Sequence, residues 1–181
     1  MSGLRRLPGD PSAKAMVQRM IRVDQAGEYG AIRIYAGQLA MLRPSEAAAE
    51  IRRMAEQEQR HLAAFDDLIR KRRVRPTALS PLWHIAGHAL GAATALMGER
   101  AAMACTVAVE EVIDEHYQGQ LGRLGDADPA LGETIRAFRA DELRHREVAI
   151  EYGAAEAPGY ALISAVVKAG SRLAIWLSTR L

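Results

Sequence analysis

The sequence contains the same pattern of acidic residues and histidine twice, once in each half of its 181 residues. In each copy, a lone Glu is followed 30 or 32 residues later by the Glu that begins a Glu-x-x-His motif. The residues are Glu28, Glu58 and His61 in the first half and Glu110, Glu142 and His145 in the second half. A chance pair of such motifs at nearly equal spacing is improbable, so we expect the fold to bring all four segments together.

The segments around these motifs have helical periodicity, and alternating strand patterns are almost absent. Asp10 followed by Pro11 predicts the start of the first helix, and Asp128 is expected to cap a later one. Pro76 and Pro81 are expected to bracket a turn. We predict helices over residues 11–42, 45–73, 86–97, 100–124, 129–152 and 160–178. The four longest helices have the proportions of a four-helix bundle.

The motifs predict a metal centre inside this bundle. Residues three positions apart project from one helix face, so each Glu-x-x-His motif presents a carboxylate beside an imidazole. One Glu from each of two helices and a Glu-x-x-His motif from each of two others is the ligand set of ferritin-like di-iron bundles. Four carboxylates offset the charge of two divalent irons, although manganese in place of one iron would suit the same ligands. We therefore predict an all-α, ferritin-like four-helix bundle with a di-iron centre.

We expect a single domain over residues 1–181, because no linker or low-complexity segment interrupts the chain. Its two pseudo-repeated halves are expected at about 12–75 and 99–155. Two additional apolar helices are expected at about 82–98 and 160–178.

Two polar residues are candidates to hold the imidazoles in place. Asp141 lies four residues before His145, and Gln57 lies four residues before His61, so each is within reach of an imidazole on its own helix. The alternative is that both are exposed polar residues without a role at the centre.

Other helix residues are expected to serve packing rather than metal binding. Gly27, Gly30 and Gly37 each destabilise a helix interior by about 1 kcal/mol, which predicts the close approach of another helix. His84 and His88 have a spacing that suits chelation, but they lack a neighbouring carboxylate. We therefore expect these two histidines to pack or to lie at an interface.

The charge pattern predicts contact with a membrane surface. Residues 76–98 contain no Asp, Glu, Lys or Arg, and five cations precede them within residues 70–75. An apolar helix beside a polybasic segment is typical of an interfacial helix on anionic lipid. The helix at 160–178 is also apolar, with one narrow polar stripe. The alternative is that both helices pack on the bundle or form a homodimer interface.

Composition excludes several other classes of protein. The single cysteine, Cys105, excludes a disulfide framework and a cysteine-based zinc or iron–sulfur site. The net charge of +2 and the lack of aromatic residues within the basic run disfavour nucleic acid as a partner. Residues 1–8 lack the apolar stretch of a secretory signal and are too few for a transit peptide.

Several longer segments resemble the 5-demethoxyubiquinone hydroxylases of ubiquinone biosynthesis. The resemblance is carried by residues 23–38, which begin Val-Asp-Gln-Ala-Gly-Glu-Tyr-Gly-Ala, and by residues 73–98, 104–111 and 174–178. It extends over nearly the whole chain from about residue 15. These segments are far more specific than a Glu-x-x-His motif alone.

The resemblance implies a membrane-associated di-iron monooxygenase that uses O2 and NADH to hydroxylate a polyprenylated 6-methoxy-3-methyl-1,4-benzoquinone or its quinol. The implied metal ligands are Glu28, Glu58, His61, Glu110, Glu142 and His145. Glu58 and Glu142 are the implied bridging ligands, and Tyr117 and His116 are candidates to handle the quinone head.

The resemblance also implies a location and partners. A bacterial form would lie peripherally on the cytoplasmic face of the membrane, and a mature eukaryotic form on the matrix face of the mitochondrial inner membrane. A homo-oligomer and other ubiquinone-biosynthesis proteins are expected partners. The NADH site is not legible, because the sequence has no Gly-rich dinucleotide fingerprint.

Three other functions use some of the same features. A ferritin-like ferroxidase or iron-binding protein would share the metal ligands, but the slight cationic excess and the uncharged segment 76–98 weigh against it. A radical-generating or desaturating di-iron protein needs a buried tyrosine near iron, for which Tyr35 and Tyr117 are candidates. A helical membrane adaptor without metal is the third alternative.

Overall fold

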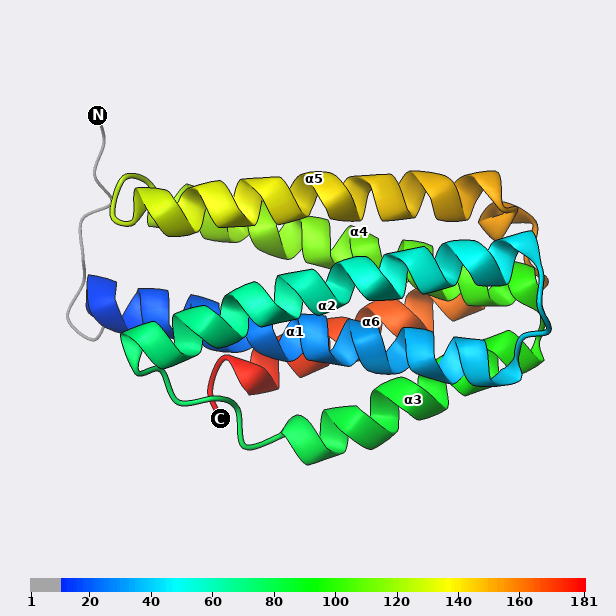
Figure 1. Ribbon diagram of the computed structural model, residues 1–181, viewed down its shortest axis with the longest axis horizontal. Helices are drawn as coiled ribbons and strands as arrows, with labels where there is room; N and C mark the ends of the chain where they lie inside the picture. The colour runs from blue at the N-terminus through cyan, green and yellow to red at the C-terminus, as the bar shows by residue number, and fades with distance from the viewer. Residues whose placement is uncertain (1–10) are drawn as a thin grey trace.

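The computed structural model describes residues 11–181, and in that part of the chain all regular structure is helical. Figure 1 shows the helices lying along one long axis. They are α1 (Ala13–Met41), α2 (Glu46–Arg72), α3 (Ser80–Leu96), α4 (Glu99–Leu124), α5 (Pro129–Glu151), the short 3₁₀ turn η1 (Ala154–Glu156) and α6 (Tyr160–Ser178). The predicted all-α class is therefore confirmed.

The start of the first helix differs from the prediction. Helix α1 begins at Ala13, and the hydroxyl of Ser12 caps it by accepting the backbone N–H of Ala15 at 3.1 Å. Asp10 lies outside the described residues, and Pro11 precedes the helix. Serine is as good a cap as aspartate, so sequence patterns alone do not choose between them.

The predicted role of Pro81 was also wrong. Pro81 does not end a turn before a helix at residue 86 but lies in the first turn of α3, which begins at Ser80. Proline suits this position because its missing N–H has no partner in the first helical turn. The other long helices end within about two residues of the predicted limits, and Asp128 caps α5 as expected.

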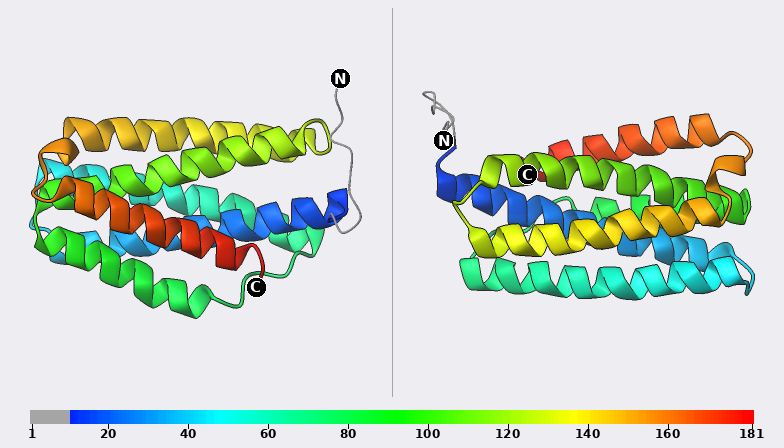
Figure 2. Two further views of the ribbon diagram at one scale, coloured as in Figure 1. Left: turned by 180° about the vertical axis from the view of Figure 1, so that it is seen from behind. Right: turned by 90° about the horizontal axis from the view of Figure 1, so that it is seen from above.

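Helices α1, α2, α4 and α5 form the ferritin-like bundle, with α1 packed on α2 and α4 packed on α5. The two apolar helices lie outside this bundle, α3 along α1 and α6 along α4 (Figure 2). Two groups of buried apolar side chains fill the interior, and a polar centre lies within the same bundle. The additional helices thus flank one side of the centre.

Glycines allow α3 to contact the backbone of α1. A Cβ atom added at Gly37 would lie 2.1 Å from the carbonyl oxygen of His88, and one at Gly91 would lie 1.9 Å from that of Ile34. The predicted role of Gly37 is therefore confirmed. At Gly27 the prediction was wrong, because an added Cβ would meet no atom within 4 Å. At Gly30 α3 does approach, since a Cβ added at Gly87 would lie 3.0 Å from the carbonyl oxygen of Gly30, but a Cβ added at Gly30 itself would meet no atom.

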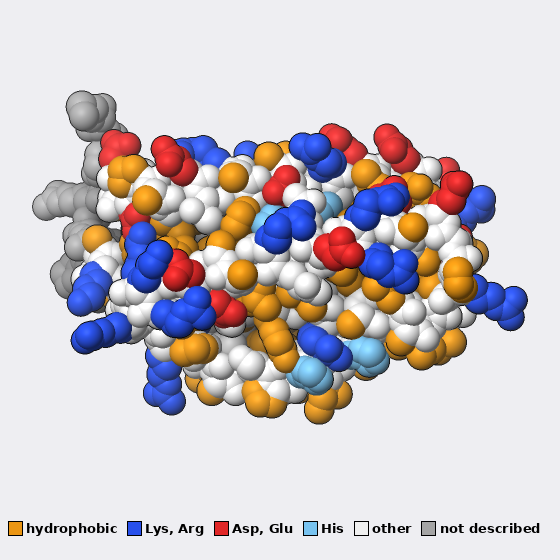
Figure 3. Space-filling model, viewed as in Figure 1, with side chains coloured by type: hydrophobic (Ala, Val, Ile, Leu, Met, Phe, Trp, Pro, Cys, Tyr) orange, Lys and Arg blue, Asp and Glu red, His pale blue; other side chains and the backbone are white. Residues whose placement is uncertain are grey.

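The outer faces of α3 and α6 are apolar and exposed. Ile85 on α3 and Leu162 on α6 expose 69% and 70% of their surface. Figure 3 shows one face of the molecule, with α3 along an edge rich in apolar side chains and cations gathered where α2 ends. By length and composition, α6 is the one helix of residues 11–181 that satisfies the criteria for a membrane span.

Candidate metal centre

The six side chains of the repeated motifs meet in the middle of the bundle and are almost completely buried. Two overlapping groups of side chains each place one ligand atom per residue within 4.8 Å of the others. The groups are Glu28, Glu58, His61 and Glu142, and Glu58, Glu110, Glu142 and His145. Glu58 and Glu142 belong to both groups, so we call the six residues the cage and the two groups its halves.

The two imidazoles point their Nδ1 atoms into the cage. Nδ1 of His61 lies 3.4 Å from Glu58 and 3.2 Å from Glu142. Nδ1 of His145 lies 3.1 Å from each of the same two residues. The shared carboxylates therefore lie between the two imidazoles.

Every residue of the cage has at least one buried side-chain atom that makes no hydrogen bond within residues 11–181. These atoms include Nδ1 of both histidines and both carboxylate oxygens of Glu142. Buried polar atoms without partners are destabilising, and buried charges are normally paired or bound to metal. The donor set of carboxylates and imidazoles therefore fits a pair of divalent metal ions.

Burial and mutual repulsion disfavour the charged forms of the acids. Burial, with the nearby charge of Glu58, raises the pKa of Glu28 to about 8. Burial, with the charges of Glu142 and Glu58, also raises the pKa of Glu110 well above its usual range. Burial lowers the pKa of His145, but the adjacent carboxylates of Glu142 and Glu58 outweigh burial and raise that pKa to about 10. Metal cations would offset this accumulation of negative charge.

Asp141 and Gln57 do contact the imidazoles, but each contacts the histidine of the opposite helix and not, as predicted, the histidine of its own helix. Nε2 of His61 lies 3.1 Å from Oδ2 of Asp141, and Nε2 of His145 lies 3.3 Å from Oε1 of Gln57. Each contact crosses between α2 and α5. The reason is that Nδ1 of each histidine faces the Glu three residues before it. Nε2, on the other side of the ring, therefore faces the opposite helix.

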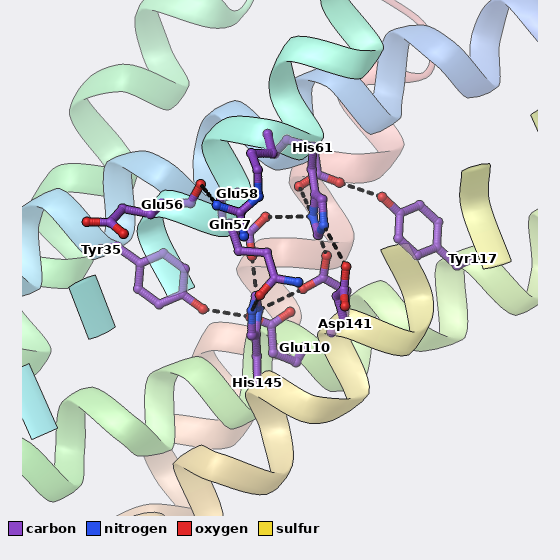
Figure 4. Close-up of polar contacts among 12 residues, drawn as sticks. Tyr35, Glu56, Gln57, Glu58, His61, Glu110, Tyr117, Asp141 and His145 are labelled. Carbon is purple, nitrogen blue, oxygen red and sulfur yellow. Dashed lines mark hydrogen bonds and ion pairs between the residues drawn. The ribbon is translucent and has the colours of Figure 1, made fainter. Parts of the chain in front are cut away.

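Two tyrosines also bind the cage crosswise, from opposite sides (Figure 4). Tyr35 of α1 donates to Glu110 of α4 at 2.9 Å, and Tyr117 of α4 donates to Glu28 of α1 at 2.5 Å. Each tyrosine lies seven residues after the Glu of its own helix. This equal spacing was the signal in the sequence that could have identified Tyr35 as a partner of the cage.

A pocket of about 320 Å³ lies beside the cage, and α1, α3, α4 and α6 form its walls. Glu28 and Tyr117 line it, and the walls are otherwise mostly apolar. Gly27 and Gly30 also line this pocket, so their missing side chains leave it open. Trp83 of α3 lines it as well.

His116 and Asp24 also line the pocket, as do Ser171 and Ser178 of α6. Nε2 of His116 lies 3.2 Å from Oδ1 of Asp24, and the amide of Gln120 donates to the same oxygen at 2.6 Å. Burial raises the pKa of Asp24 despite these two contacts. His116 is therefore held by a buried carboxyl group at the wall of the pocket.

His84 and His88 lie outside the centre, in the contact between α3 and α1. Nδ1 of His84 lies 2.6 Å from the hydroxyl of Tyr29, and Arg33 donates to Nδ1 of His88 at 3.2 Å. The expectation that these histidines pack at an interface is therefore confirmed.

Comparison with known proteins identifies the family. The family model described as "Ubiquinone biosynthesis protein COQ7" matches residues 15–178. A relative from Rhodospirillum rubrum, named 3-demethoxyubiquinol 3-hydroxylase, is 57% identical over 176 residues, covering 97% of this chain and 83% of its own.

Two eukaryotic relatives carry related names. The protein from Homo sapiens, named NADPH-dependent 3-demethoxyubiquinone 3-hydroxylase, mitochondrial, is 49% identical and covers 95% of this chain and 81% of its own. The protein from Saccharomyces cerevisiae, named 5-demethoxyubiquinone hydroxylase, mitochondrial, is 43% identical, and the match covers 92% of this chain and 79% of the yeast protein. The resemblance inferred from the sequence is thus confirmed, and the chain belongs to the COQ7 family of ubiquinone biosynthesis proteins.

Proposed function

We propose that this protein is a di-iron monooxygenase that hydroxylates a polyprenylated demethoxyubiquinone or its quinol with O2. The observation that carries the proposal is the mostly apolar pocket that ends at Glu28 and Tyr117, directly beside the cage. The names of the relatives supply the substrate class and place the reaction in ubiquinone biosynthesis. We take residues 1–181 as one functional domain, because both halves contribute to the same cage.

In this proposal the six residues of the cage would hold two iron ions, and Glu58 and Glu142, which belong to both halves, would be available to both ions. When bound, such an iron pair supplies the activation of O2. The residues around the cage fix the ligands: Tyr35 and Tyr117 orient the two outer carboxylates, and contacts at Nε2 orient the imidazoles. Burial of the cage keeps bulk water away from it.

The polar residues of the pocket would bind the quinone head. His116, held by Asp24, is placed to give a proton to a ring oxygen or to take one from it. Tyr117 has its hydroxyl committed to Glu28, so it would position that carboxylate and pack its ring against the substrate. The glycines at 27 and 30 leave space for the ring itself.

The apolar helices would let the polyprenyl tail reach the bilayer. Both α3 and α6 line the pocket on one side and expose apolar residues on the other. Lys168 and Arg172 of α6 form ion pairs with acids of α4, which favours a helix lying on the membrane rather than crossing it. The cations of residues 70–75 would bind anionic headgroups, on the cytoplasmic face in a bacterium or the matrix face in mitochondria.

A reduced nicotinamide dinucleotide would supply the electrons. The family resemblance implies NADH, whereas the names of several relatives specify NADPH. Parallel assays of the purified protein with each dinucleotide would decide between them.

The experiment that tests the proposal measures iron and product together. The purified protein is expected to contain about two irons per chain and to convert demethoxyubiquinol in liposomes. The variant E142A is expected to lose both metal and product, because Glu142 belongs to both halves of the cage. E147A removes an exposed carboxylate from the same helix and should change neither. Unchanged iron content in E142A would refute the ligand set.

The same experiment separates the other functions. A ferroxidase would bind and oxidise iron without forming a quinone product. A radical-generating protein would give a tyrosyl signal in electron paramagnetic resonance, for which both buried tyrosines are well placed. Deletion of the gene in its host, followed by extraction of quinones, should show accumulation of the demethoxy compound if the proposal is correct.

A further inference from the structure

The residues around the cage follow the same two-fold repeat as the cage itself, but at two pairs of equivalent positions their chemistry differs. The tyrosines occupy equivalent positions seven residues after the lone Glu of each half. Gln57 and Asp141 also occupy equivalent positions, one residue before the Glu of each Glu-x-x-His motif. One of these is a neutral amide and the other is a carboxylate, so the two imidazoles have different partners.

This difference acts at Nε2 and is transmitted through the ring to Nδ1, the nitrogen that faces the cage. With Nδ1 facing the cage, the hydrogen on Nε2 is donated outward, to Asp141 from His61 and to Gln57 from His145. A carboxylate acceptor forms the stronger hydrogen bond and makes the imidazole a more basic ligand.

The imidazole of His61 is also held more firmly. The ring of Phe138 stacks on it with 3.9 Å between ring centroids, and Phe65 contacts Phe138 edge to face. Phe138 lies four residues before Glu142, and the equivalent position of the first half is Met54. A flexible thioether side chain cannot stack in the same way.

The two halves of the cage also differ in their relation to the pocket. Glu28 and Tyr117 line the pocket, whereas Glu110 and Tyr35 do not. His61 belongs to the half that contains Glu28. The more basic and more firmly held imidazole therefore lies in the half beside the pocket.

From these differences we infer that the two metal positions are inequivalent, and that the position formed with Glu28 and His61 binds its ion first and more tightly. Asp141 is a positioning residue for this site and acts through His61. The inference rests on the proposed di-metal centre but adds an order of loading and a cause for it.

The test is a titration of metal-free protein with Fe(II) in the absence of O2, followed by calorimetry. The unaltered protein should bind two ions in two steps whose affinities differ by about 10- to 100-fold. D141N should weaken the first step by a similar factor and bring the two steps together. Q57E supplies the missing carboxylate to His145 and should strengthen the second step, with the first unchanged. Circular dichroism of each metal-free variant controls for folding.

Single ligand variants identify which position is the tight one. H145A should keep one tight step, whereas H61A should keep only a weak one. Two equal steps in the unaltered protein, or a first step that D141N leaves unchanged, would overturn the inference while the metal centre stands. Failure of the unaltered protein to bind any iron would overturn both.

Discussion

Helices α3 and α6 both form walls of the pocket, but they are attached to the bundle by different forces. Helix α3 contacts α1 through backbone atoms at Gly37 and Gly91, where even one added carbon would overlap a carbonyl group. Helix α6 contacts α4 partly through ion pairs, the half-buried pair of Lys168 with Glu111 and the exposed pair of Arg172 with Glu115. Close packing is insensitive to salt, whereas exposed ion pairs are weak and screened. Ile163 and Val167 of α6 are also buried in the core, so ion pairs are only part of its attachment. Because salt can weaken that part, we expect α3 to be the fixed wall and α6 the more movable one.

The largest expected effect tests the fixed wall. G91A would place a Cβ atom 1.9 Å from the carbonyl oxygen of Ile34, and neither backbone can yield locally. We expect α3 to separate from α1, with a loss of about 2–3 kcal/mol in the free energy of unfolding. Denaturant-induced unfolding followed by circular dichroism measures this loss.

A matched control is available on α4. G122A adds the same methyl group at an exposed helical position where nothing lies within 4 Å. It should stabilise the protein by about 0.5–1 kcal/mol, because alanine is the better helix former. Equal effects of the two substitutions would show that α3 is not fixed by close packing.

A smaller effect is expected where the two walls meet. The indole N–H of Trp83 donates to the hydroxyl of Ser178 at 2.9 Å and joins α3 to the end of α6. W83F removes this hydrogen bond and should lower the free energy of unfolding by about 1 kcal/mol. W176F alters a half-exposed tryptophan of α6 and serves as the control. If both variants unfold alike, the hydrogen bond does not hold the walls together.

The smallest effect is expected at the ion pairs of the movable wall. K168Q and R172Q should each lower the free energy of unfolding by less than about 1 kcal/mol at low salt. High salt should abolish that difference, because screening weakens the pairs in the unaltered protein as well. The loss caused by G91A should persist in high salt. A salt-independent loss in K168Q would mean that packing, not charge, attaches α6.

The composition of the cage was predictable because its spacing is local. Residues three apart on one helix share a face whatever the tertiary structure, so Glu58 and His61 had to lie together. The partners of the imidazoles were not predictable in this way. Gln57 and Asp141 are within reach of the histidines of their own helices, but each bonds the histidine opposite. That choice depends on how α2 and α5 face each other.

The glycines show a second limit of prediction. A glycine inside a helix indicates that a side chain would be harmful or unnecessary there, but not which neighbour is responsible. At Gly37 the neighbour is the backbone of α3, whereas at Gly27 and Gly30 it is the open space of the pocket. Helix boundaries followed from caps and prolines except at two helix starts. Ser12, and not Asp10, precedes α1, and Pro81 fitted both a turn and a helix start.

The open space beside Gly27 and Gly30 has a practical consequence for redesign. Because an added methyl group would touch nothing, alanine at either position should leave folding intact while reducing the room for a ligand. Substitutions at these two positions should therefore reduce the volume of the pocket without lowering the free energy of unfolding. Testing each alanine variant with quinone analogues that lack single ring substituents would show which part of the ring lies against each position. The contacts among the surrounding helices would stay unchanged.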